Sequence, residues 1–269
     1  MDVLERTFGV RKPVIAMLHL PRLPAVRGDV AGGIAKAVDV VGRDLAVLQE
    51  SGVDGVMFCN EADLPYQLAV GHEIVAGMAA VVGQLKRDVR VPFGVNLLWD
   101  AKASLAVARA VGAAFVREVM TGVYESDLGM IEPSIGEIGG YRLAIGASDV
   151  LLFDNIAPEF ASAIGRRSIA DRAKGAAFLG VDAILISGPA AGTPFEMSDL
   201  VMAKEAVPNT PVIANTGVRA STIGDIFKVA DGAIVGTSLK RDGITWNEVD
   251  PARATALVEA AAKARAAAG

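Results

Sequence analysis

Three residues with side chains suited to acid and base catalysis lie at the ends of short apolar runs: His19, Glu118 and Asp154. An imidazole exchanges protons near neutral pH, and a carboxyl group can act as a general acid or base. We therefore predict that His19, Glu118 and Asp154 are catalytic residues. If Glu118 is buried it needs a cationic partner, and the adjacent Arg117 is the candidate.

The same three side chains would form a hard, oxygen-rich set, so a divalent ion, Mg²⁺ or Mn²⁺, is the one cofactor that we consider. The single Cys59 excludes an intramolecular disulfide and a cysteine-cluster metal site, and its apolar neighbours predict a buried side chain. No apolar run contains a lysine, which disfavours a Schiff-base mechanism. We expect Lys240, the lysine nearest to the predicted site, to contact a phosphate or a loop.

Two turns near the C-terminal end of the chain are rich in Gly, Thr and Ser, and each follows an apolar run. Small residues let backbone N–H groups approach an anion closely, and hydroxyl groups add further donors. We predict that these turns, with a third small-residue turn upstream, bind the phosphate group of a substrate. The predicted phosphate-binding residues are Ser187, Gly188, Asn215, Thr216, Gly217, Gly236, Thr237 and Ser238.

Eight short apolar runs recur along the chain, separated by segments long enough for helices. This alternation predicts parallel βαβ units, and 269 residues suit one (β/α)₈ barrel, which needs about 250. We predict a single TIM-barrel domain over residues 1–269, with the phosphate-binding loops after strands 7 and 8. A doubly wound open sheet is the alternative. The predicted strands are Val14–Leu18, Gly55–Phe58, Pro92–Asn96, Ala114–Val116, Val150–Phe153, Ala183–Ile186, Val212–Ala214 and Ala233–Val235.

In such a barrel the active site gathers at the C-terminal ends of the strands. Since successive side chains of a strand point in opposite directions, Glu118 faces either the mouth of the barrel or the surrounding helices. The longer amphipathic segments predict those helices. They are Val30–Glu50 with Asp29 as N-cap, Leu64–Arg87, Lys102–Val111, a helix from Ser221 or Thr222 to about Val229, and Pro251–Ala268 with Asp250 as N-cap.

Composition limits the classes of partner. The net charge is −5 with a sequence pI near 5.2, and no large basic cluster occurs, so nucleic acid binding is not expected. No uninterrupted run of 18 apolar residues predicts a membrane span, and the first residues lack the pattern of a secretory signal. We expect a cytoplasmic protein that binds a small phosphorylated substrate and that can form a homo-oligomer.

Several longer stretches together resemble one known family. They are Met17–Pro21 with Leu23 and Pro24, Ile186–Gly192, Ala214–Val218, Asp231–Lys240, and Trp246–Pro251. In these stretches the chain is similar to the BtpA/SgcQ family. The resemblance implies a ribulose-phosphate-binding type of barrel, in which Thr216, Gly217, Gly236 and Thr237 would hold the phosphate. One branch of that family is linked to photosystem I accumulation and another to sugar-metabolism gene clusters.

Two functions fit these observations. The first is an enzyme acting on a sugar phosphate or phosphoribosyl compound by acid and base catalysis, as an isomerase, a lyase or an enzyme that cleaves a glycosidic bond. The second is a non-catalytic assembly or stability factor, as in photosystem I biogenesis, that retains an anion site. A ring of polar side chains gathered at one mouth of the barrel favours the enzyme, because a scaffold has no need of it.

Overall fold

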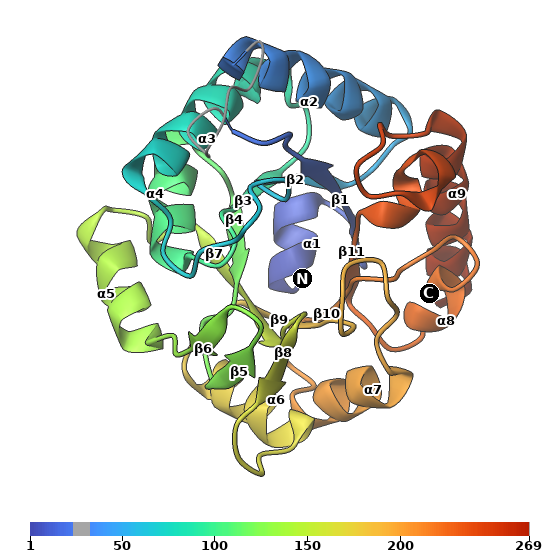
Figure 1. The fold of residues 1–269 in the computed structure, drawn as a ribbon. Helices are drawn as coiled ribbons and strands as arrows, with labels where there is room; N and C mark the ends of the chain where they lie inside the picture. Colours follow the sequence, from blue (N-terminus) through green and yellow to red (C-terminus); the bar gives the residue numbers. More distant parts are fainter. Residues whose placement is uncertain (24–32, 269) are drawn as a thin grey trace.

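The computed structural model describes residues 1–23 and 33–268, and eight of its strands close into a parallel barrel (Figure 1). These strands are β1 Val14–His19, β2 Gly55–Cys59, β3 Phe93–Asn96, β4 Phe115–Glu118, β7 Leu151–Ala157, β9 Ala183–Ile186, β10 Val212–Asn215 and β11 Gly232–Val235. Each pairs in parallel with the next along the chain, and β11 pairs with β1 to close the ring. The predicted TIM barrel is confirmed, and each predicted strand coincides with one of these eight.

Helices surround the barrel on its outer side (Figure 1). They are α2 Gly33–Glu50, α3 His72–Leu85, α4 Ala101–Val111, α5 Ile135–Ala144, α6 Ile169–Phe178, α7 Met197–Ala206, α8 Ile223–Ile226 and α9 Pro251–Ala268. Helix α3 begins eight residues later than predicted, because Pro65 disfavours helical backbone at the residue before it and Gly71 is the N-cap. Helix α8 is shorter than predicted. The predicted N-cap Asp29 lies outside the described residues.

A short N-terminal helix that we did not predict, α1 Val3–Phe8, lies across the bottom of the barrel (Figure 1). It begins where the Asp2 side chain accepts a hydrogen bond from the Glu5 N–H group. The ring of Phe8 packs edge-on against Phe115, with centroids 5.7 Å apart, and Phe115 stacks on Phe153 at 4.7 Å. These rings fill the lower interior, so a cavity can form only at the C-terminal ends of the strands.

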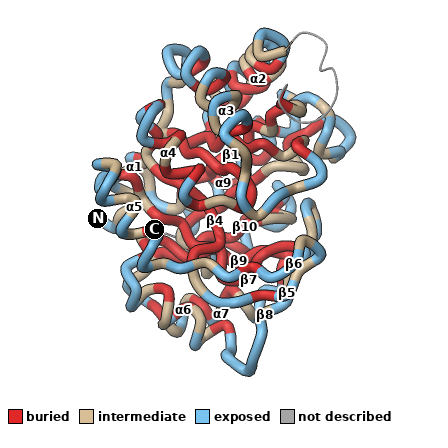
Figure 2. Tube along the Cα trace, turned by 60° about the vertical axis from the view of Figure 1, so that its left-hand side comes forward, coloured by how far each residue is buried: buried red, intermediate tan, exposed pale blue. Residues whose placement is uncertain are grey.

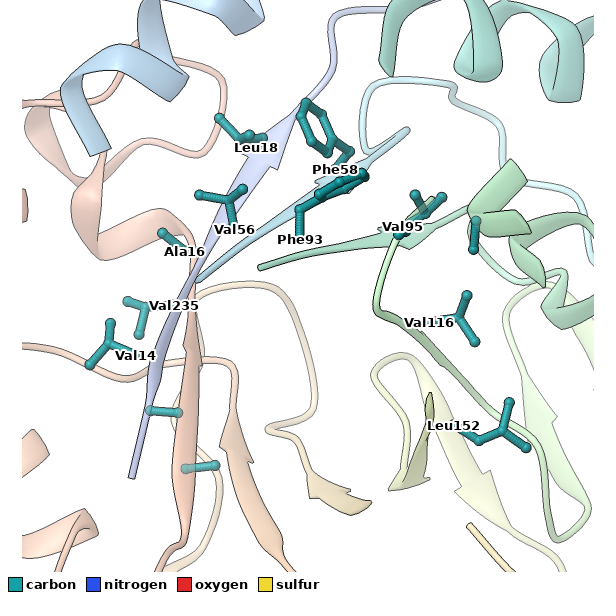
Figure 3. Close-up of a cluster of buried hydrophobic side chains, with 14 of the residues drawn as sticks. Val14, Ala16, Leu18, Val56, Phe58, Phe93, Val95, Val116, Leu152 and Val235 are labelled. Carbon is teal, nitrogen blue, oxygen red and sulfur yellow. The ribbon is translucent and has the colours of Figure 1, made fainter. Parts of the chain in front are cut away.

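The side chains of each strand alternate between this interior and an outer core. In β1, Ile15 and Met17 belong to the interior cluster, whereas Val14 and Leu18 pack with the helices. Figure 3 shows part of the outer set, and Figure 2 shows that burial is concentrated in the strands and the inner faces of the helices. The two clusters explain why the strands are apolar on both sides.

Three further strands, each of three residues, form a small antiparallel sheet in the order β6-β5-β8. They are β5 Tyr124–Ser126, β6 Gly129–Ile131 and β8 Ala161–Ala163. They arise from the long loops after β4 and β7, which brings those two loops together. Strands this short leave little periodicity in the sequence, and we did not predict them. Among the described helices, none is both long and apolar enough to cross a membrane.

The aromatic filling of the lower barrel predicts opposite effects for two glycine substitutions. A Cβ atom at Gly94 would lie 2.2 Å from the ring of Phe115, whereas one at Gly83, on the exposed side of α3, meets nothing within 4 Å. We expect Gly94→Ala to destabilise the protein by about 1–3 kcal/mol through overpacking. Gly83→Ala should stabilise it by up to about 1 kcal/mol through helix propensity. Urea unfolding of both variants measures these changes, and a neutral Gly94→Ala would contradict this packing.

Candidate functional site

A cavity of about 580 Å³ opens at the C-terminal ends of the strands. The end of β1 and the loops after β2, β3, β7, β9, β10 and β11 contribute to its walls, together with residues near the start of α9. This is the end of the barrel at which catalytic residues of the fold are found. The position of the cavity therefore agrees with the prediction, but the side chains that line it differ in part.

Glu118 does not face the cavity, and we therefore correct the prediction that it is a catalytic residue. In β4, Phe115 and Arg117 point into the barrel, and Glu118 points outward like Val116. Its carboxyl group accepts hydrogen bonds from Asn96 Nδ2 and, at 3.1 Å, from Ser104 Oγ on α4. Burial raises the pKa of Glu118 to about 8. This is a structural carboxyl group between barrel and helix.

Asp154 is also absent from the cavity wall. The interior residues of β7 are Phe153 and Asn155, and the Asp154 carboxylate instead accepts bonds from Met120 N at 2.7 Å and from Thr121 Oγ1 at 2.6 Å. Burial raises its pKa to about 6, although these hydrogen bonds oppose the shift. Asp154 therefore holds the loop that follows β4, and we correct its predicted catalytic role.

The proposed metal set is not assembled. His19 lines the cavity, whereas Glu118 and Asp154 lie outside it, so the three side chains do not converge. Over residues 1–23 and 33–268, no group of three or more His, Cys, Asp or Glu side chains is arranged to hold an ion. The residues predicted for Mg²⁺ or Mn²⁺ therefore do not fit such an ion.

Arg117, the inward neighbour of Glu118, places a positive charge at the bottom of the cavity. Its side chain is only 8% exposed, and its Nη1 donates to Asn215 Oδ1 at 3.1 Å. Two carboxyl groups line the same cavity, Glu61 from the loop after β2 and Glu159 from the loop after β7. Burial raises the pKa of Glu61, although the positive charge of Arg117 opposes the shift. Glu61 is therefore a candidate for proton transfer to a ligand in the cavity.

Glu159 is held in place by three side chains. Its Oε1 accepts from Thr216 Oγ1 at 2.5 Å and from Asn215 Nδ2 at 3.3 Å, and its Oε2 accepts from Asn155 Nδ2 at 3.3 Å. Sequence analysis missed Glu159, because β7 continues four residues beyond the predicted end at Phe153. The alternation of inward residues, continued past Phe153, could have drawn attention to this segment.

His19 lies in the cavity as expected, but as a neutral group. Burial, together with the positive charges of Lys240 and Arg117, lowers its pKa to about 3. Its Nδ1 atom is buried and has no hydrogen-bond partner in the described part of the chain. At neutral pH the imidazole can donate or accept a hydrogen bond, whereas its protonated form is not populated.

Six of the eight predicted phosphate-binding residues line the cavity, the exceptions being Ser187 and Gly188. Ser187 is buried beneath it and accepts from Asn215 Nδ2 at 2.7 Å. A Cβ atom at Gly188 would lie 2.0 Å from the Thr193 carbonyl oxygen, so this glycine allows its loop to fold on itself. Gly217 has a φ of +69°, and a Cβ atom there would lie 2.4 Å from Pro194 Cα. The loop after β9 thus packs tightly against the loop after β10.

The hydroxyl groups of these loops form hydrogen bonds within the protein. Thr216 Oγ1 donates to Glu159, Thr237 Oγ1 lies 2.9 Å from Thr245 Oγ1, and Ser238 Oγ donates to the Val218 carbonyl oxygen at 2.6 Å. The backbone differs. Among the described residues, no N–H group of positions 216–218 or 236–238 donates to another protein group. Backbone N–H groups are therefore the available anion donors of these loops.

Lys240 does not contact the cavity, contrary to our expectation of a phosphate or loop contact. Its Nζ atom forms a buried ion pair with Asp44 Oδ2 at 2.6 Å, and Asp44 Oδ1 accepts from Val249 N at 2.8 Å. This pair attaches the chain after β11 to α2. Cys59 is buried, as predicted, and burial raises the pKa of its thiol.

The outward position of Glu118 predicts a stability difference that depends on pH. Its folded pKa near 8 exceeds the usual value of 4.5, so its contribution is complete below pH 4.5 and is lost as pH rises toward 8. Glu118→Gln removes this titration and leaves that of Asp154. Between pH 6 and 8 the wild type should lose about 2 kcal/mol more unfolding free energy than the variant, measured in urea. Equal losses would place Glu118 in solvent.

Comparison with known proteins gives two kinds of match. The sequence pattern of the BtpA family matches residues 10–263. The putative sgc region protein SgcQ of Escherichia coli is 43% identical over 261 residues, which cover 96% of this chain and 97% of that protein. The photosystem I biogenesis protein BtpA of Synechocystis is 34% identical over 98% of this chain and 92% of its own length.

Solved structures match the fold at low identity. A geranylgeranylglyceryl phosphate synthase from Thermoplasma acidophilum, solved with sn-glycerol-1-phosphate, has a TM-score of 0.63 and 15% identity, covering 98% of this chain and 99% of that one. A thiamine phosphate pyrophosphorylase from Pyrococcus furiosus has a TM-score of 0.58 and 14% identity, covering 94% and 96%. These structures establish the barrel, and the two sequence relatives, each similar along nearly its whole length, establish the family: the chain belongs to the BtpA family.

Proposed function

We propose that this protein is an enzyme that acts on a small phosphorylated metabolite, a sugar phosphate or a phosphoribosyl compound, by acid and base catalysis at the mouth of the barrel. One observation carries the proposal. Two loops whose backbone N–H groups donate to no protein acceptor in the described residues line the same cavity as Arg117, Glu61 and Glu159. An anion site next to proton-transfer groups is what such a reaction requires.

The loops after β10 and β11 would bind the phosphate. They lie on adjacent strands, and among the described residues their N–H groups at positions 216–218 and 236–238 donate to no protein acceptor. Backbone N–H groups can donate hydrogen bonds to the oxygen atoms of a phosphate without any charged side chain. Two arginines, Arg219 and Arg253, line the cavity at exposed positions and would add attraction at its rim.

The charged residues at the bottom of the cavity would then act on the end of the substrate that is distant from the phosphate. Glu61, whose pKa is raised, serves as the acid, and Glu159, held by three donors, serves as the base. Arg117 stabilises negative charge that develops between them. Neutral His19 orients the substrate by a hydrogen bond. Binding of the distant phosphate fixes the reacting atoms against these groups, which by itself lowers the barrier.

The structural neighbours support the substrate class. They include a geranylgeranylglyceryl phosphate synthase in complex with sn-glycerol-1-phosphate, a thiamine phosphate pyrophosphorylase and an N-(5′-phosphoribosyl)anthranilate isomerase. They differ in the reaction but share a phosphorylated compound. Isomerisation, carbon–carbon cleavage and cleavage of a glycosidic bond all use the acid–base pair proposed here.

A second function, an assembly factor without catalysis, is favoured by the 34% identity to the photosystem I biogenesis protein. In that case the cavity would bind an anion and turn nothing over. The enzyme is the better proposal, because burying Arg117 next to Glu61 and Glu159 is costly and contributes nothing to a scaffold.

Ligand binding is the first property to test. We expect phosphate esters to raise the melting temperature of the wild type. A ligand concentration of 100 times the dissociation constant should increase the free energy of unfolding by about 2.7 kcal/mol. Thr237→Val removes the hydroxyl contact with Thr245 that helps to fix the loop after β11, so the backbone N–H groups of that loop are less well positioned and binding should weaken about tenfold. Thr210→Val, before β10 and outside the cavity, is the matched control and should behave as wild type. Absence of any shift with inorganic phosphate and all esters would refute the anion site.

The carboxyl groups can be separated by a matched pair of variants. Glu61→Gln should lower turnover of an ester that binds by about 10²–10⁴-fold while leaving its dissociation constant near that of the wild type. Glu118→Gln, outside the cavity, should keep wild-type turnover. Binding without turnover in the wild type would favour the assembly factor, and full activity in Glu61→Gln would remove that residue from the mechanism.

A further inference from the structure

Three aromatic side chains line the cavity. Trp99 comes from the loop after β3, Tyr66 from the loop after β2, and Phe160 from the loop after β7. No step of the proposed acid and base chemistry requires them. We call these three side chains the aromatic wall, because aromatic residues in a cavity pack well against the planar rings of ligands.

The strand order places Trp99 opposite the phosphate loops. In the closed ring β1-β11-β10-β9-β7-β4-β3-β2, strand β3 is four strands from β10 in both directions, so the two face each other across the barrel axis. In the same way β4, which carries Arg117, faces β11. A ligand anchored at the β10 and β11 loops therefore extends past Arg117 toward Trp99.

Trp99 is fixed in position before any ligand binds. The loop that carries it is held on one side by Leu98 N, which donates to Asn60 Oδ1 at 2.9 Å. On the other side Asp100 caps α4 through Ala103 N at 2.9 Å and accepts from Val70 N at 3.2 Å. The indole is 9% exposed, so its ring is part of a rigid wall. Preorganised aromatic surfaces bind rings at low entropic cost.

The middle of the cavity suits a hydroxylated group. Glu61 and Glu159 supply carboxyl oxygens that accept hydrogen bonds from hydroxyl groups, and Arg117 supplies donors. The cavity of about 580 Å³ is also larger than a phosphate requires and falls within the range of about 300–1,000 Å³ found for drug-sized ligands. Three zones thus follow one another: an anion site, a polar middle and an aromatic wall.

Resting on the proposed function, we infer that the substrate is a phosphoribosyl compound that carries a planar heterocycle, like a nucleoside 5′-monophosphate, with its ring against Trp99. The phosphate lies on the β10 and β11 loops, and the ribose hydroxyl groups lie between Glu61 and Glu159. A simple sugar phosphate would leave the aromatic wall uncovered. The aromatic contacts therefore determine specificity for the ring, whereas the loops determine affinity for the phosphate.

The sequence offers a direct reporter, because Trp99 and Trp246 are its two tryptophans and Trp246 is exposed and outside the cavity wall. In Trp246→Phe protein, fluorescence comes from Trp99 alone. We expect at least one of the monophosphates of adenosine, guanosine, cytidine and uridine to quench it, and to bind at least about tenfold more tightly than ribose 5-phosphate. In Trp99→Phe protein the emission of Trp246 should not change.

Two variants complete the test. Trp99→Leu should reduce nucleotide affinity to that of ribose 5-phosphate without changing the latter. Phe160→Leu, at a 41% exposed position where folding is not at risk, should lower nucleotide affinity alone. If ribose 5-phosphate shifts the melting temperature but every nucleotide binds no more tightly than it does, the inference is wrong and the proposed function stands. If neither ribose 5-phosphate nor any nucleotide binds, both are wrong.

Discussion

The alternation of side chains along a closed parallel strand decides which residues this cavity contains. A barrel strand presents every second side chain to the interior, and a shift of one residue exchanges the inner and outer sets. Arg117 is therefore inside and Glu118 outside, and Asn155 is inside and Asp154 outside. The outer carboxyl groups join strands to helices and loops. The inner groups, which include a buried guanidinium, line or support the cavity.

Asn215 connects these inner groups to the loop that we propose binds the phosphate. Its side chain accepts from Arg117 and donates to Glu159 and Ser187, while the next residue, Thr216, also bonds to Glu159. Thr216 has a φ of +67°, unusual for a β-branched residue, at the first position of the loop after β10. Strain of this kind persists where surrounding contacts fix it, and it is concentrated at functional sites. A ligand on this loop thus acts directly on the residues that position Glu159.

Much of this could be predicted from the sequence, because the barrel follows from local patterns. Each strand is an apolar run, and glycine and hydroxyl residues mark the loops after β10 and β11. The side-chain direction at the ends of β4 and β7 could not be predicted, because these ends were placed two and four residues too early. Glu159 was missed for this reason. The hydroxyl groups of Thr216 and Ser238 looked like ligand donors, and only the tertiary contacts show that protein groups occupy them.

We propose that phosphate binds to the backbone of the loops after β10 and β11, and a crystal structure with ribose 5-phosphate tests this most directly. We expect phosphate oxygens within about 3.2 Å of the backbone nitrogens of Gly217 and Thr237, with the sugar directed toward Arg117. A phosphate bound to the Arg117 guanidinium or to the outer surface, with these N–H groups left unoccupied, would contradict it.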